Sequence, residues 1–450
     1  MQTEYVARKA IKSAINQGAS EVEAYATRSR VLIAYVDDGN IKSVEEKHDL
    51  GVSVRVCLGK KMGQASSTVT NIRMAETCAE NAVDLAKFSA ADPDFKGLST
   101  GERGISQATF DMDLAGITPD ILVSKADAVV AAIEDQGAKV PNGLVRVGAM
   151  QWTVANTNGI EVEGKGTLLY SHFTGMAVGD KPGEGVGAVY ANRLLAFEPS
   201  AMGDGIGQRA QQSAKAVAFR GHEHIPVIIR PGDLAEMLGS TVGFAVSGEN
   251  VSKKRSPWVD AKGKDVASSI VTIKDSPLDE RGVFRSSFDD EGLACEERDV
   301  IEAGRLRTFL HDSYSAKLLN DKPTGNAFRR GHTDALGAYR QPLTISPSNL
   351  VVQRGKTSLA EMVSGIKRGL IVEKTASAEV NGVSGAFGFE VRLGLLIEDG
   401  VVTQPVSRCL LVGNFYEALK NVQAIGDDAT VVGGVITPSI CFASLEIIGE

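Results

Sequence analysis

IPVIIRPGDLAEMLGSTVGFAVSGE, residues Ile225 to Glu249, is the stretch of sequence that predicts most about this fold. The apolar run Ile225 to Ile229 predicts a buried strand, and Pro231 suits the first turn of a helix, where no backbone N–H is needed. Residues suited to a core then recur at helical spacing; they are Leu234, Met237, Leu238, Thr241, Val242 and Ala245. Inside a helix Gly239 and Gly243 each cost about 1 kcal/mol relative to Ala, so we expect another segment to pack closely against their face.

The composition bounds the class of protein. A chain of 450 residues that is 43% hydrophobic is too long for one core, and we expect two domains, residues 1–222 and residues 223–450. The net charge of −8 argues against a nucleic-acid partner. No window approaches 18 apolar residues and the N-terminus lacks a signal-peptide core, so we expect no membrane contact and a cytoplasmic location. Five distant cysteines without a CxxC pair predict reduced, mostly buried thiols.

The order of predicted elements indicates an α+β fold. In the N-terminal part, alternating strands flank an Asp38-Gly39 turn and are followed by a helix from Asn71 to Phe88. The same order occurs twice, from Leu32 to Phe88 and from Leu144 to Phe219, which predicts an antiparallel sheet carrying helices. The C-terminal part is β-rich and includes a predicted strand from Val283 to Phe288. We expect it to form a barrel-like, closed or nearly closed sheet around the buried helix.

One histidine pair invites a metal hypothesis. His222 and His224 flank Glu223, and two histidines at i and i+2 of a strand would point to one face. The sequence offers no third ligand nearby, and the pair falls where the two domains meet. A solvated linker is therefore the preferred interpretation, and no metal site is predicted. No HExxH or HExxxH pattern occurs among the six histidines.

Two polar segments are candidates for binding substrate. Asp289-Asp290-Glu291-Gly292 could supply carboxylates, although consecutive strand residues alternate faces, and an acidic turn is the alternative. The loop Thr324 to Arg330 carries two arginines and could hold a peptide backbone or a carboxylate, or could be an ordinary surface loop. The predicted substrate-binding residues are Asp289, Asp290, Glu291, Thr324, Asn326 and Arg329. Cys295 and Cys441 have no nearby histidine to activate them, so they are interpreted as structural thiols.

Several segments together, in this order and spacing, resemble the TldD/PmbA family of zinc peptidases over nearly the whole chain. Apart from the stretch at Ile225 to Glu249, they are Gly59-Lys60-Lys61-Met62-Gly63-Gln64-Ala65-Ser66-Ser67, Phe288-Asp289-Asp290-Glu291-Gly292, Thr324-Gly325-Asn326-Ala327 and Ile397-Glu398-Asp399-Gly400-Val401-Val402-Thr403-Gln404-Pro405-Val406. The resemblance implies that a TldD-type subunit binds zinc through an HExxxH helix and a later cysteine, with the glutamate as general base.

In that register this chain has Gly239 and Phe244 at the histidine positions and Ser240 at the glutamate position. Cys441 lies too late, inside a predicted strand, to be the family's cysteine. The chain therefore resembles the other kind of subunit, PmbA, also called TldE. The resemblance implies no catalytic residue, metal or cofactor in this chain, zinc in a TldD-type partner of a heterodimer, and peptide substrates. A homodimer is the alternative assembly, and we expect core residues to fill the emptied site.

Three functions stay open from the sequence. The first is a non-catalytic partner subunit of a cytoplasmic metallopeptidase. The second is an independent metal-dependent hydrolase with a diverged site built from His222, His224, Asp289, Asp290 or Glu291. The third is a peptide-binding module without catalysis.

Overall fold

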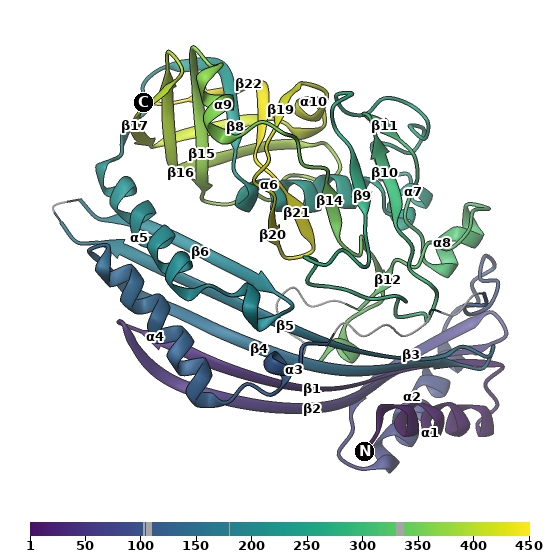
Figure 1. Cartoon of the computed structure of the whole chain (residues 1–450). Coiled ribbons are helices and arrows are strands. Elements are labelled where there is room, and N and C mark those ends of the chain that lie inside the picture. The colour runs from purple at the N-terminus through teal and green to yellow at the C-terminus, as the bar shows by residue number, and fades with distance from the viewer. Residues whose placement is uncertain (102–103, 105–109, 180, 330–336) are drawn as a thin grey trace.

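A computed structural model describes residues 1–101, 104, 110–179, 181–329 and 337–450. Its N-terminal part is one long, curved antiparallel sheet in the strand order β3-β2-β1-β4-β5-β6 (Figure 1). The strands are β1 (Glu21–Asp37), β2 (Asn40–Leu58), β3 (Lys61–Thr68), β4 (Ala138–Asn156), β5 (Glu161–Ala177) and β6 (Gly183–Ala191). The predicted turn between β1 and β2 is confirmed, because Asp38 and Gly39 both adopt positive φ there, 47° and 72°.

The predicted repeat is also confirmed. Each half of the sheet is a three-stranded meander with one helix before it and one after it. Helices α1 (Thr3–Asn16) and α2 (Ile72–Phe88) pack on β1 to β3, while α4 (Pro119–Asp135) and α5 (Pro199–Lys215) pack on β4 to β6. Because strand order places β1 beside β4, the two halves meet at the centre of a single sheet.

Side-chain alternation along β1 shows how both faces of the sheet are covered. Ala24 and Ala26 belong to the apolar cluster under α1 and α2. Tyr25, on the opposite face, belongs to a different cluster with Phe288 and Leu293 of the C-terminal part. One face therefore packs on the helices, and the other receives segments of the C-terminal part.

The C-terminal part contains a closed five-stranded barrel, as expected for this β-rich region. The ring runs β15-β8-β22-β18-β16 and closes because β16 also pairs with β15. Its strands are β8 (His222–Ile229), β15 (Arg368–Thr375), β16 (Ala386–Glu398), β18 (Cys409–Asn414) and β22 (Ile440–Ile448). Strands β17 (Val401–Ser407) and β7 (Val217–Ala218) extend this sheet beyond β16, and β19 (Val422–Ile425) pairs with β22.

A second C-terminal sheet has the order β11-β10-β9-β14-β21-β20. Its short strands are β9 (Ile273–Asp275), β10 (Arg298–Glu302), β11 (Arg305–Leu306), β14 (Leu350–Val352), β20 (Thr430–Val432) and β21 (Val435–Thr437). Helix α6 (Pro231–Leu238) lies between this sheet and the barrel, in contact with β15, β20 and β21 (Figure 1). The remaining elements are α3 (Met112–Ala115), α7 (Gly248–Ser252), α8 (Ser313–Leu318), α9 (Leu359–Ser364), α10 (Phe415–Lys420), β12 (Ala327–Phe328), β13 (Thr344–Ile345) and the 3₁₀ turns at Leu194–Ala196 and Ala338–Arg340.

Two predictions about local structure were wrong. Val283 to Phe288 is irregular and has only an isolated bridge, from Phe288 to Ala294. His222 to His224 is the start of β8, so it is not a linker. The predicted division between residues 222 and 223 stays a prediction. In the described part of the chain, no helix has both the length and the apolar character needed to span a bilayer.

Candidate functional site

The helix that begins at Pro231 contains a π turn. Regular α-helix ends at Leu238, residues Gly239–Gly243 form a π turn, and helical residues continue to Ala245. In a regular α-helix, residues five apart lie about 140° apart around the axis. A π turn accommodates one extra residue, so it brings positions five apart towards one face. This geometry places Gly239 and Phe244, the two family histidine positions, on a common side of the helix.

The expectation that core residues fill this face was wrong. Gly239 is exposed, and a Cβ added there would meet no atom within 4 Å; at Gly243 the nearest atom would be Pro347 Cδ at 3.9 Å. Ser240 and Phe244 are half-buried. The apolar side chains of the helix point to the opposite side, where Leu234 and Leu238 are fully buried. Helical spacing predicted the buried stripe correctly, but the glycines do not mark a close contact.

The loop that contains Val380 and Gly382 contacts this face of the helix at Ser240 and Phe244. Ser240 Oγ accepts a hydrogen bond from Val380 N at 3.1 Å and donates to Glu236 O at 2.8 Å. The Phe244 ring lies against Gly382, where an added Cβ would come within 2.7 Å of its Cγ. Gly239, Ser240 and Phe244 therefore present a hydrogen, a hydroxyl and a phenyl ring, none of which matches the nitrogen, thiolate or carboxylate donors that zinc takes in proteins.

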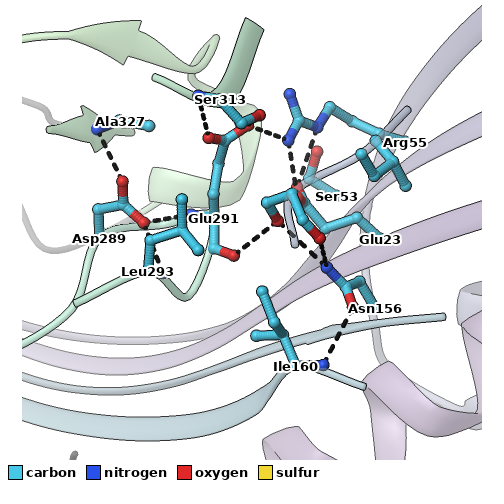
Figure 2. A network of polar contacts seen from close by, with 12 residues as sticks. Glu23, Ser53, Arg55, Asn156, Ile160, Asp289, Glu291, Leu293, Ser313 and Ala327 are labelled. Carbon is cyan, nitrogen blue, oxygen red and sulfur yellow. Dashed lines mark hydrogen bonds and ion pairs between the residues drawn. The ribbon is translucent and has the colours of Figure 1, made fainter. Parts of the chain in front are cut away.

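The acidic segment Asp289 to Glu291 belongs to a buried network between the N-terminal sheet and the C-terminal part (Figure 2). Glu291 Oε1 accepts from Arg55 Nη2 at 3.0 Å and from Ser313 Oγ at 2.8 Å, and Oε2 accepts from Ser313 N at 2.7 Å. Arg55 also binds Glu23 through two hydrogen bonds of 2.7 and 2.9 Å. Burial alone would lower the pKa of Arg55, but the charges of Glu23 and Glu291 outweigh it and raise that pKa.

Asp289 organises the turn that carries Glu291. It accepts hydrogen bonds from Glu291 N and Leu293 N, both at 3.0 Å, and from Ala327 N at 3.1 Å (Figure 2). Burial, followed by the charge of Glu291, raises the pKa of Asp289 well above its usual range. The interpretation of this segment as a turn is confirmed, because Gly292 N donates to Asp289 O at 2.9 Å. The turn is buried, however, and its carboxylates are engaged by protein donors.

The loop that begins at Thr324 divides into structural and cavity-facing residues. Thr324 and Asn326 are buried and bind each other at 2.6 Å, and Asn326 Nδ2 donates to Asp275 at 2.6 Å. Arg329 is also buried, with Nη2 3.3 Å from Glu23 Oε1 and its guanidinium over the Tyr25 ring at 5.3 Å. Arg330, the second arginine of the predicted loop, lies outside the described residues.

A cavity of about 110 Å³ lies between the sheet and the C-terminal part, beside Arg329. Its lining includes Tyr25, Trp152, Phe328 and Asp290 as well as Arg329. Within the described part of the chain, Nε and Nη1 of Arg329 have no hydrogen-bond partner. Burial lowers the pKa of Arg329, yet a guanidinium keeps its charge in proteins. Of the six predicted substrate-binding residues, Arg329 and Asp290 face this cavity.

The histidine pair has a neighbour that the sequence analysis missed. His222 Nε2 lies 2.5 Å from Glu446 Oε1, and the ligand atoms of His222, His224 and Glu446 all lie within 4.8 Å of one another. Strand β22 places Glu446 directly opposite His224. Alternation within β8 predicted the common face of the histidines, but the third residue depends on a strand pairing more than 200 residues away in sequence.

The structure separates the residues of the diverged-hydrolase hypothesis. His222 and His224 are exposed on the barrel strand β8, whereas Asp289 and Glu291 are buried, and Glu291 is bound by Arg55 and Ser313. The cysteines are free thiols, and burial raises the pKa of Cys409 and of Cys441 to about 11. Cys295 is only partly buried, so its interpretation as a buried thiol holds less well than that of the other four.

A long antiparallel sheet joined to a closed barrel, with a π-turn helix beside the barrel, defines the class as an α+β protein. The family models agree. The model described as PmbA/TldA metallopeptidase C-terminal domain matches residues 222–449, and the model of domain 1 matches residues 22–87. The chain belongs to the PmbA/TldD metallopeptidase family.

Individual relatives match along nearly the whole chain. It is 25% identical to Metalloprotease PmbA of Escherichia coli O157:H7, with 92% of this chain and 88% of that protein covered. It is 24% identical to the Metalloprotease PmbA homolog of Haemophilus influenzae, with 98% and 95% covered. The crystal structure of TldE from Thermococcus kodakarensis is similar with a TM-score of 0.89 and 25% identity, covering 99% of this chain and 100% of that chain.

Proposed function

We propose that this chain is the non-catalytic subunit of a cytoplasmic TldD/TldE-type metallopeptidase that cuts peptides, and that a TldD-type partner holds the zinc. The observation that carries the proposal is the π-turn helix. It brings Gly239 and Phe244 to one side, as the family pattern requires, but supplies no metal ligand there. A zinc peptidase needs about three protein ligands and an open position for water. Zinc in the partner would supply the Lewis acid and the activated water.

The open helix face supports an assembly with a second subunit. Gly239 is exposed and has free space above it, so a segment of a partner can approach the backbone there. The cavity beside Arg329 supports the peptide part of the proposal, because a buried guanidinium with free N–H groups suits a carboxylate. Asp290, Tyr25 and Phe328 line the same cavity and would limit what fits beside that carboxylate.

The test compares the chain alone with the chain co-purified with a TldD-type subunit. We expect the lone chain to cleave no unfolded peptide, and the complex to cleave in a zinc-dependent manner. Peptidase activity of the lone chain that EDTA abolishes and zinc restores would refute the proposal. In the complex, Arg329→Lys should raise KM for peptides with a free carboxylate more than it lowers kcat, whereas the same peptides with amidated C-termini should respond little.

A variant that adds ligands tests whether the π-turn helix would bind zinc if it carried the family's side chains. The triple variant Gly239→His, Ser240→Glu, Phe244→His rebuilds the family pattern on the π turn. Gly239 has the helical φ of −61° and space for a side chain, so the histidine fits there. We expect this variant to bind zinc at the helix, and the parent helix to bind none. The variant Gly239→Ala, Ser240→Ala, Phe244→Ala is the matched control.

A further inference from the structure

We infer that His222, His224 and Glu446 form a site for a late first-row divalent metal ion such as zinc, on the outside of the barrel. The inference is independent of the proposed function, because it concerns β8 and β22 and not the π-turn helix. It also differs from the diverged-hydrolase hypothesis, because it needs neither Asp289 nor Glu291.

The strands fix the spacing of the three donors. His222 and His224 lie on one face of β8, two residues apart, while Glu223 on the opposite face binds Arg368 through two hydrogen bonds of 2.7 Å. Glu446 lies opposite His224 in the antiparallel pair with β22. Glu446 pairs with His224 on one side and with Val412 of β18 on the other, so the backbone that carries this carboxylate is held on both sides.

The distances suit a chelate after small side-chain rotations. All ligand atoms lie within 4.8 Å of one another. Metal–ligand bonds of about 2.0–2.2 Å place the donors of a tetrahedral zinc roughly 3.3–3.6 Å apart. His222 Nε2 and Glu446 Oε1 are 2.5 Å apart. These two atoms would have to separate by roughly 1 Å to admit the ion. His222 is 61% exposed and Glu446 28% exposed at the side chain, so both can move and water can complete the coordination.

The donor chemistry selects the class of ion. Two neutral imidazoles and one carboxylate favour zinc, nickel, copper or cobalt over magnesium or calcium, which prefer oxygen ligands. The three groups carry a net charge of −1 when the histidines are neutral, which attracts a divalent cation. A bound ion would link the first barrel strand to the last. A backbone hydrogen bond already joins these strands where β8 begins and β22 ends, because Gly449 N donates to Gly221 O at 2.8 Å.

The experiment is calorimetric titration of the full, tag-free chain with ZnCl₂ after EDTA treatment and dialysis. We expect one zinc ion per chain, binding weakened at least about tenfold by His222→Ala, His224→Ala or Glu446→Gln, and a thermal midpoint that rises with zinc only when the three donors are present. His48→Ala is the matched control, because His48 is exposed and 3.1 Å from Glu46. It should bind zinc as the parent does.

Two results would overturn the inference. One is a parent chain that takes up no zinc, and the other is a His222→Ala, His224→Ala double variant that binds it as tightly as the parent. This test is independent of the proposed function. Zinc binding at the π-turn helix should be measured in the double variant, which lacks the two histidines of the barrel site. Peptidase activity of the complex should be the same with and without the double substitution.

Discussion

Replacing Arg55 with Met should show how strongly the two parts of the molecule are held together. The side chain is 12% exposed and lies between two carboxylates, Glu23 and Glu291, which are 0% and 1% exposed. Removing the guanidinium leaves Glu23 with Arg329 at 3.3 Å, but takes from Glu291 the cation that binds it and leaves it the donors of Ser313. Breaking a buried pair in this way costs about 3–5 kcal/mol, because one charge is left uncompensated.

The rescue follows from the same geometry. Glu291→Gln added to Arg55→Met removes the stranded charge while keeping a side chain that can bind Ser313, and should restore about 2 kcal/mol of the loss. Arg8→Met is the matched control, because Arg8 forms an ion pair of 2.7 Å with Glu161 but is 61% exposed. An exposed pair contributes little, so this variant should unfold almost as the parent does.

Tryptophan fluorescence during urea unfolding measures the effect. The chain has two tryptophans; the Trp152 ring lies 5.9 Å from Phe288 across the junction, and Trp258 lies in the C-terminal core. In a Trp258→Phe background, the Trp152 signal should change at lower urea in Arg55→Met than in the parent. The reasoning is refuted if Arg55→Met and Arg8→Met unfold at the same urea concentration, or if adding Glu291→Gln destabilises Arg55→Met further.

Two further variants test burial and backbone conformation. Burial lowers the pKa of His311 to about 4, below the unfolded value of about 6.5, so its contribution to stability is present above pH 6.5 and is lost as pH falls towards 4. Over that range the free energy of unfolding of the parent should fall by roughly 3 kcal/mol more than that of His311→Gln, measured by urea unfolding at each pH. Parallel curves of unfolding free energy against pH would contradict the burial argument. Gly325→Ala should lower the thermal midpoint, because Gly325 has φ of +72° and an added Cβ would lie 2.3 Å from Ala294 O. Gly433→Ala isolates the conformational part of that cost, because Gly433 has φ of +58° and no atom within 4 Å of an added Cβ. Equal losses of thermal midpoint at the two positions would exclude the clash.

Sequence patterns predicted the turns and the buried faces of helices correctly, because residues close together in sequence determine these features. Positive φ at Asp38 and Gly39 sets the hairpin between β1 and β2, and the helical spacing after Pro231 identified the buried side of α6. The site was harder to predict. In the sequence Glu291 is only part of an acidic turn. Its partners in the structure, Arg55 and Ser313, are 236 and 22 residues away in sequence. A carboxylate's role depends on such partners, which periodicity does not reveal.

The π turn is a feature that periodicity also missed, and its contacts explain what holds it in place. A π turn interrupts the regular hydrogen bonding of an α-helix, so its carbonyl groups need other partners. Tyr416 Oη lies within hydrogen-bonding distance of Thr241 O, at 3.2 Å, and of Gly382 O, at 2.6 Å. Ser240 Oγ meanwhile accepts from the neighbouring Val380 N. One tyrosine and one serine therefore join the π turn to the loop across it, so protein hydrogen bonds hold the geometry that brings Gly239 and Phe244 to one side.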